Sequence, residues 1–292
     1  MLLRRSNARP YWRTLLVLAR ATNLPTVWSN CLAGWWLGGG GDLLPLLLLL
    51  TGASCLYTCG MFLNDAFDAE FDQEHRRERP IPAGDIGLDE VWAWGFGWLG
   101  LGAVILVLLG KVTATFALLL AAGIVIYNAT HKALPLAPLL MAACRLLLYL
   151  VAASVAVEGV TGLAIWCGLA MAAYVAGLSY LARHELSKGP VEVWPAWCLG
   201  APILLGLLVN GGEHQFRALG LCLALAIWTL RSLRYAFWSP VRNIGLAASG
   251  LVAGIVLVDL LAVAGGGHAG ISLLFLLLFA ATLVSQRFAP AS

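Results

Sequence analysis

Long apolar blocks, separated by short polar or glycine-rich gaps, run through most of the chain. A helix needs about 17–25 such residues to cross a hydrocarbon core of about 30 Å. The pattern predicts an all-α, polytopic membrane bundle of nine or ten transmembrane helices, folded as a single domain over residues 1–292. The predicted spans lie near 21–39, 43–63, 88–110, 112–127, 134–157, 161–181, 192–210, 216–236, 243–264 and 270–286.

Composition agrees with a membrane protein. Hydrophobic residues make up 61% of the chain and charged residues 11%, against roughly 45–50% and about 25% in soluble domains. The seven cysteines follow neither metal-ligand spacing nor a secreted disulfide pattern. The composition therefore excludes a water-soluble fold.

The basic residues are distributed unevenly between the two sides of the predicted bundle. With a cytoplasmic N-terminus, fifteen of the eighteen Lys and Arg residues lie inside, two lie outside and Arg145 lies within a span. The positive-inside rule favours this orientation, in the inner membrane of a cell. The net charge of +3 then reflects topology and not nucleic-acid binding. Because the loops at 64–87, 128–133 and 182–191 share one face, we expect a central chamber open to the cytoplasm.

The most informative loop begins with an acidic segment directly after the second span. At 100° per residue, its four oxygen-bearing side chains lie within about 100° of one helix face. Carboxylates so close repel each other, more strongly beside the apolar membrane, so a cation is expected to compensate. Hard oxygen ligands suit Mg²⁺, which is usually held by one or two carboxylates and substrate phosphates. The candidate metal ligands are Asn64, Asp65, Asp68 and Asp72.

Three arginines follow the acidic segment, at Arg76, Arg77 and Arg79. A guanidinium group can grip diphosphate oxygens through two parallel hydrogen bonds, and Arg79 is the preferred candidate. The alternatives are that the arginines orient the chain by the positive-inside rule or neutralise a solvated acidic helix end.

Asn64 to Asp72, together with Arg79-Pro80-Ile81-Pro82-Ala83-Gly84, resembles the first aspartate-rich motif of the UbiA superfamily of intramembrane prenyltransferases. The resemblance extends along most of the chain, including Arg20, Asn23-Leu24-Pro25 and Tyr127-Asn128 with Lys132. It implies Mg²⁺-dependent transfer of an isoprenoid chain from a prenyl diphosphate to an acceptor. It also implies that the acidic segment holds the Mg²⁺ that carries the diphosphate.

The second aspartate-rich motif of that family is altered here. Residues 180–188 contain a single carboxylate, Glu185, which we expect to bind metal. Arg183 and Lys188 are expected to meet the diphosphate directly and to replace the charge of a second ion. The alternative is an ordinary basic cytoplasmic loop.

Arg145 stands within the fifth predicted span, where a charge is costly and usually faces a polar cavity or a partner. We expect it to face the chamber, with a structural ion pair as the alternative. Asp259, in a late span, is expected to be structural. The full assignment makes Asp68, Asp72, Arg145 and Lys132 catalytic; Arg79, Arg183, Lys188 and Tyr127 diphosphate-binding; and Arg20, Asn23 and Tyr180 part of the acceptor pocket.

The resemblance implies electrostatic catalysis, in which cations neutralise the leaving diphosphate away from water. The partners are then a prenyl diphosphate, a small acceptor, by default aromatic or phenolic, and membrane lipid. A non-catalytic relative that binds or moves isoprenoid-linked lipids is the main alternative. A CDP-alcohol phosphotransferase has a different aspartate spacing, and an ion-coupled transporter would carry its carboxylates near the bilayer midplane.

Overall fold

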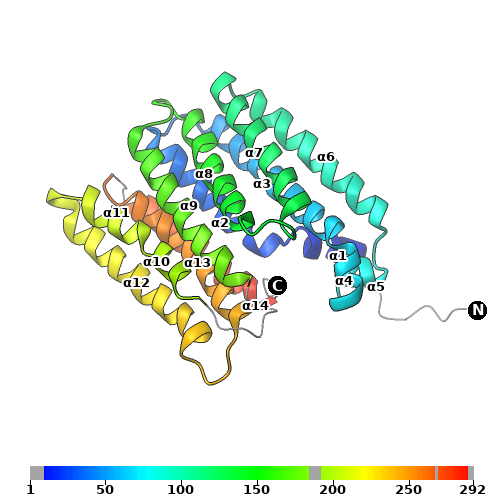
Figure 1. The fold of residues 1–292 in the computed structure, drawn as a ribbon. Coiled ribbons are helices and arrows are strands. Elements are labelled where there is room, and N and C mark those ends of the chain that lie inside the picture. Colours follow the sequence, from blue (N-terminus) through cyan, green and yellow to red (C-terminus); the bar gives the residue numbers. More distant parts are fainter. Residues whose placement is uncertain (1–9, 184–191, 267–268, 289–292) are drawn as a thin grey trace, which may run out of the picture.

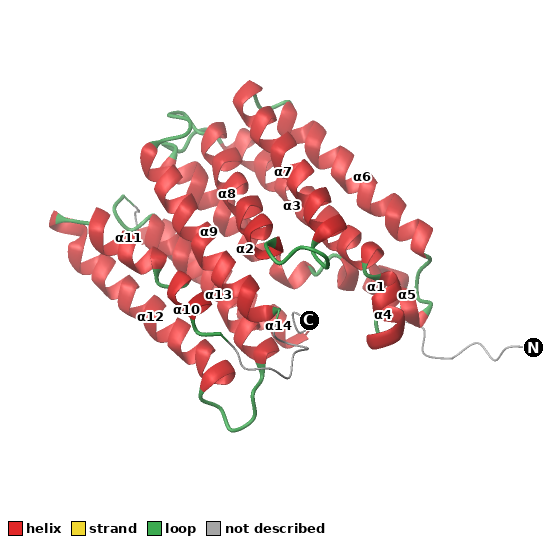
Figure 2. Ribbon diagram, in the orientation of Figure 1, coloured by secondary structure: helices red, strands yellow, loops and turns green. Residues whose placement is uncertain are grey.

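The computed structural model describes residues 10–183, 192–266 and 269–288, which contain helices and loops but no strand (Figure 2). Eight of the helices are long and apolar enough to cross a membrane. This confirms an all-α, multi-pass membrane protein. The eight are α3 (Leu43–Phe67), α6 (Leu88–Val107), α7 (Lys111–Thr130), α8 (Ala137–Val155), α9 (Gly162–Ala182), α12 (Gln215–Phe237), α13 (Ile244–Ala262) and α14 (Ala269–Phe288).

Two predicted spans are shorter than expected. The first is α2 (Leu24–Leu37), 14 residues preceded by a 3-10 turn, η1 (Ala21–Asn23). Such a helix is about 21 Å long, less than a hydrocarbon core of about 30 Å. The other divides into α10 (Trp194–Cys198) and α11 (Ala201–Val209), because Pro202 cannot continue the hydrogen bonding of a preceding helix. By length and composition, eight of the ten predicted spans are supported.

The helices form one bundle in which α2 and α9 hold central positions (Figure 1). Helix α2 packs against α3, α8, α13 and α14, while α9 packs against α8, α10, α11 and α13. Helices α3, α6 and α7 lie on one side of this centre, and α12 lies on the other (Figure 1). Segments far apart in sequence therefore meet around α2.

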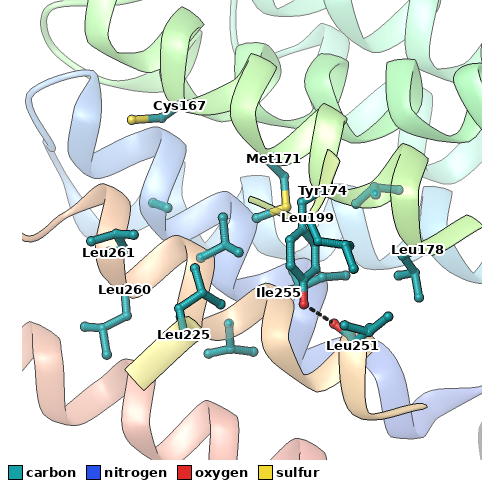
Figure 3. Packing of buried hydrophobic residues seen from close by; sticks show 14 of the residues in the cluster. Cys167, Met171, Tyr174, Leu178, Leu199, Leu225, Leu251, Ile255, Leu260 and Leu261 are labelled. Carbon is teal, nitrogen blue, oxygen red and sulfur yellow. Dashed lines mark hydrogen bonds between the residues drawn. The ribbon is translucent and has the colours of Figure 1, made fainter. Parts of the chain in front are cut away.

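Buried apolar side chains of α9, α12 and α13 interlock beside α2 (Figure 3). Met171, Tyr174, Leu225 and Ile255 are all at most 1% exposed. The Tyr174 hydroxyl donates to the Leu251 carbonyl over 3.0 Å, which gives its polar atom a partner inside the apolar core (Figure 3). This packing fixes α13 against α9.

Helices α2 and α8 approach closely at Gly34. A Cβ atom there would lie 2.7 Å from the Tyr149 carbonyl oxygen and 2.8 Å from the Ala152 Cβ. Small residues at such positions let membrane helices pack backbone against backbone. The glycine therefore sets the spacing between α2 and α8.

Three short helices gather at one end of the bundle: α1 (Tyr11–Leu18), α4 (Ala69–His75) and α5 (Pro80–Ala83) (Figure 1). Helix α1 packs against α3, α5 and η1, and α4 packs against α3 and α5. The acidic segment runs from the last turn of α3 into α4 and so lies within this group.

Candidate active site at the end of helix α3

The acidic segment contains a break at Asp68, between the end of α3 and the start of α4. Hydrogen bonding still runs through the break, because the Asp68 amide donates to the Asn64 carbonyl over 3.0 Å and the Asp72 amide to the Asp68 carbonyl over 2.8 Å. The three aspartates are buried, with exposures of 6%, 9% and 2% for Asp65, Asp68 and Asp72. The predicted clustering on one side is thus retained despite the break.

Two arginines hold the first part of the segment. Arg79 Nη1 lies 3.0 Å from Asp65 Oδ1 and 3.1 Å from Asp72 Oδ2. Arg20 Nη2 lies 3.2 Å from the same Asp65 oxygen and 3.1 Å from Asn64 Oδ1. Asp65 therefore serves as a common anchor for both guanidinium groups.

The chain places these arginines through two turns. Arg79 directly precedes α5, whose first residue is Pro80, and proline favours the start of a helix because it lacks an N–H donor. Arg20 joins α1 to η1 in the left-handed region, with φ 42°, which is uncommon for a residue other than glycine. The Tyr57 hydroxyl donates to its carbonyl over 3.2 Å, which helps to hold this conformation.

Asp68 is held from the loop that follows α7. Lys132 Nζ lies 2.8 Å and His131 Nε2 3.3 Å from Asp68 Oδ1, and Lys132 also donates to the Phe67 carbonyl over 3.2 Å. Burial tends to raise the pKa of Asp68, but the bonds from His131 and Lys132 outweigh it, so the pKa is lowered. The hydrogen bond to Asp68 raises the pKa of His131. Sequence analysis did not single out His131, although its place beside Lys132 was a usable signal.

Asp72 has a different environment. Burial is the main cause that raises its pKa, and the nearby carboxylates add to the effect while Arg79 opposes it. Its Oδ1 atom is buried and has no hydrogen-bond partner in the described part of the chain. An unpartnered buried carboxylate oxygen is costly and suits a cation.

The donor set fits Mg²⁺, with one qualification. Among the residues that the structure describes, no three His, Cys, Asp or Glu side chains are arranged to hold a metal ion on their own. A site with one or two carboxylates, an amide oxygen and substrate phosphates is the usual arrangement for Mg²⁺. Asn64, Asp68 and Asp72 offer such oxygens.

The remaining predicted residues divide into those near the acidic segment and those away from it. Tyr127 stacks on His131, a neighbour of Asp68, with 5.3 Å between ring centres. Asn23 lies partly exposed at the end of η1. Tyr180 instead packs edge-on against Trp194, with 4.7 Å between ring centres.

Arg183 does not bind the acidic segment. Its guanidinium group donates to the Pro135 carbonyl over 2.6 Å and to the Leu134 carbonyl over 3.2 Å. It therefore ties the end of α9 to the loop that carries His131 and Lys132. Glu185 and Lys188 lie outside the described residues, so their assignments stay predictions.

Arg145 also contacts no residue of the acidic segment directly. Its Nη1 donates to Asn30 Oδ1 over 2.6 Å and to the Thr26 carbonyl over 3.3 Å, both on α2. Asn30 Nδ2 in turn donates to Asp259 Oδ2 over 2.8 Å. Asp259, predicted to be structural, is fully buried, and an amide group links it to Arg145. A catalytic role for Arg145 stays a prediction.

Comparison with known proteins places this arrangement in a family. The profile of the UbiA prenyltransferase family matches residues 23–189. That is more than half of the chain, so the protein belongs to the UbiA prenyltransferase family.

Several curated relatives are named digeranylgeranylglyceryl phosphate synthase. The protein from Ignicoccus hospitalis is 31% identical over 120 residues, which cover 41% of this chain and 39% of the relative. The one from Methanoregula boonei is 28% identical over 42% of this chain and 44% of its own length. These alignments thus span less than half of each relative. The Methanopyrus kandleri protein is 28% identical over 88% of this chain and 92% of its own length.

Solved structures share the fold. A UbiA homologue from Archaeoglobus fulgidus bound to GPP and Mg²⁺ superimposes with a TM-score of 0.65 at 15% identity, over 94% of this chain and 99% of its own. A digeranylgeranylglyceryl phosphate synthase structure gives a TM-score of 0.60 at 17% identity over the same shares. At these identities the likeness establishes the fold alone.

Proposed function

We propose that this chain transfers an isoprenoid group from a prenyl diphosphate to an acceptor within the bilayer, with Mg²⁺ at the acidic segment. One observation carries the proposal: buried Asp65, Asp68 and Asp72 meet Arg79 and Lys132, with closest contacts of 2.8–3.1 Å, at one end of an apolar bundle. Such a site combines oxygen donors for Mg²⁺ with cations for phosphate.

The contacts suggest a division of work among these residues. Asp65 keeps its two arginines in place, because one of its oxygens accepts from both. Asn64, Asp68 and Asp72 would hold Mg²⁺, which when bound would supply positive charge to the leaving diphosphate. Arg79 and Lys132 would bind the diphosphate oxygens, since each already reaches the carboxylates beside them.

We infer that the site opens to the cytoplasm in an inner membrane, through a chamber bounded by the helices around α2. The charge distribution favours this orientation. The apolar helices would keep water from the allylic carbon while the diphosphate leaves.

The named relatives point to a different acceptor from the aromatic default. A digeranylgeranylglyceryl phosphate synthase makes, by its name, a glycerol phosphate lipid with two isoprenoid chains. We therefore propose a phosphate-bearing glycerol lipid alcohol as the acceptor. The sequence match to these relatives supports this choice.

The test uses purified protein in nanodiscs with Mg²⁺, geranylgeranyl diphosphate and either a geranylgeranylglyceryl phosphate or a phenolic acid. We expect diphosphate release and a doubly prenylated glycerol lipid by mass spectrometry, and no product with the phenolic acid. Omission of Mg²⁺ should stop the reaction. Binding of the prenyl diphosphate without product from any acceptor would contradict the proposal and favour a carrier of isoprenoid lipids.

A further inference from the structure

A second polar group lies inside the bundle, away from the acidic segment. It consists of Ser29, Asn30, Arg145, Tyr149 and Asp259, which we call the deep polar cluster. The cluster joins α2, α8 and α13, and a cation and a carboxylate in such a position are costly and usually functional.

Asn30 separates the two charges of the deep polar cluster. Asp259 receives hydrogen bonds from Ser29 over 2.6 Å, from Asn30 over 2.8 Å and from the Tyr149 hydroxyl. Arg145 binds the other end of the Asn30 amide over 2.6 Å and makes no direct contact with the carboxylate. For stability alone, a direct ion pair would neutralise the guanidinium group better. The Asn30 amide therefore orients the guanidinium group of Arg145, which has no anion in direct contact within the described ranges.

Arg145 is the one member of the deep polar cluster that is not fully buried. Ser29, Asn30, Tyr149 and Asp259 are each 0% exposed, whereas Arg145 is partly exposed. Arginine carries five N–H donors. Three hydrogen bonds are present, one of them a long contact of 3.4 Å to Thr26 Oγ1, so donors remain.

A chain of hydrogen bonds joins the deep polar cluster to the acidic segment. Arg145 donates to the Thr26 carbonyl over 3.3 Å, and the Thr26 hydroxyl donates to the Asn23 carbonyl over 2.8 Å. The backbone amide of Asn23 donates to the Arg20 carbonyl over 3.0 Å, and Arg20 binds Asp65. Thr26 and Asn23 thus connect Arg145 to the proposed diphosphate site.

We propose that Arg145 binds the anionic phosphate group of the acceptor, and that Asp259, acting through Asn30, orients the guanidinium group for it. The inference rests on the proposed function, because it assigns the acceptor of the same reaction. A guanidinium fork matches phosphate oxygens through two parallel hydrogen bonds. Arg20, Arg79 and Lys132 already bind carboxylates of the acidic segment, whereas Arg145 has no carboxylate in direct contact among the described residues.

The test exchanges the amide of Asn30, which contacts Arg145, and the carboxylate of Asp259 behind it. The double variant Asn30→Asp with Asp259→Asn keeps net charge and size but moves the carboxylate into contact with Arg145. A second double variant, Arg145→Gln with Asp259→Asn, removes both charges together. Binding of the glycerol phosphate lipid and of a non-hydrolysable geranylgeranyl diphosphate analogue is measured separately by calorimetry, without turnover.

We expect both double variants to lose about 10- to 100-fold in affinity for the phosphate lipid, the range for a hydrogen bond to a charged group. Affinity for the diphosphate analogue should change by less than about twofold, and elution as a folded species should be unchanged. Replacement of the phosphate lipid by its uncharged alcohol should abolish the difference between wild type and variants.

Three results would overturn the inference. An equal loss for both ligands would place Arg145 in the diphosphate site, and an unchanged affinity for both would make the cluster structural only. Failure of the wild type to bind the phosphate lipid would also overturn it. Since each ligand is measured alone, diphosphate binding without turnover would count against the proposed function and not against this site.

Discussion

The carboxylates at the end of α3 and the carboxylate of the deep polar cluster are neutralised in different ways. Asp65, Asp68 and Asp72 touch the side chains of Arg79 and Lys132 directly, at a helix break where loops meet the bundle. Asp259 touches only neutral donors, and its cation is one amide away. At the end of α3, a metal ion can replace the basic side chains beside the carboxylates, and those side chains can then bind phosphate. In the deep polar cluster, neutral donors hold Asp259, and Arg145 stays available to a ligand.

The largest expected effect follows from substitutions in the acidic segment at the end of α3. Asp72→Asn and Asp68→Asn should each lower turnover by about 10²–10³-fold, because each variant removes charge from the groups that hold the metal and its diphosphate. The melting temperature should stay within a few degrees, since the amide still accepts hydrogen bonds. Diphosphate release at saturating Mg²⁺ measures the effect.

Glu70→Gln is the matched control for these variants, because Glu70 is an exposed acid in the same segment. It should retain wild-type turnover. If Asp68→Asn and Asp72→Asn lowered stability but not turnover, the acidic segment would be structural in the same way as Asp259. The proposed difference between the two sites would then be wrong.

The second effect concerns stability. Asp259→Ala should lower the free energy of unfolding by about 3 kcal/mol, because it leaves Arg145 as an uncompensated charge and three donors without an acceptor. Asp259→Asn should cost less, since its one amide oxygen can still accept from Ser29 and Asn30, which both donate to the same oxygen of Asp259. Reversible unfolding in mixed micelles provides the measurement. An equal loss in Asp259→Asn and Asp259→Ala would show that charge, not hydrogen bonding, sustains the cluster.

The smallest effect is expected at Arg183. The sequence suggested that it binds diphosphate, which would predict a loss of about 1.5–3 kcal/mol in binding. Its bonds to the Leu134 and Pro135 carbonyls instead suggest that it positions the loop with Lys132. Arg183→Ala should then weaken binding of the diphosphate analogue by less than about tenfold, and exposed Arg77→Ala should have no effect. A loss of a hundredfold or more would restore a direct contact with the ligand.

Local features of the chain were predictable from the sequence. The apolar blocks predicted the long helices, and helical periodicity placed Asp65, Asp68 and Asp72 together, because both depend on neighbours within a few residues. Arg79 was close enough in sequence to reach Asp65, 14 residues away.

Contacts between distant helices were not predictable. Arg145 meets Asn30 across 115 positions, and Asn30 meets Asp259 across 229. No periodicity within one helix indicates which faces of two others will meet, so Asn30 was not singled out. The division of the seventh predicted span was different, since Gly200 and Pro202 stand in the sequence as visible interruptions.

The close approach of α2 and α8 at Gly34 limits which residues can replace this glycine. A methyl group there would meet the Tyr149 carbonyl and Ala152 at under 3.0 Å, so either helix would have to move. The hydrogen bond from Arg145 to Asn30, one helical turn before Gly34, tolerates a displacement of only a few tenths of an ångström before it weakens. A larger residue at Gly34 would therefore disturb Arg145 and Asn30, although the glycine contacts neither side chain.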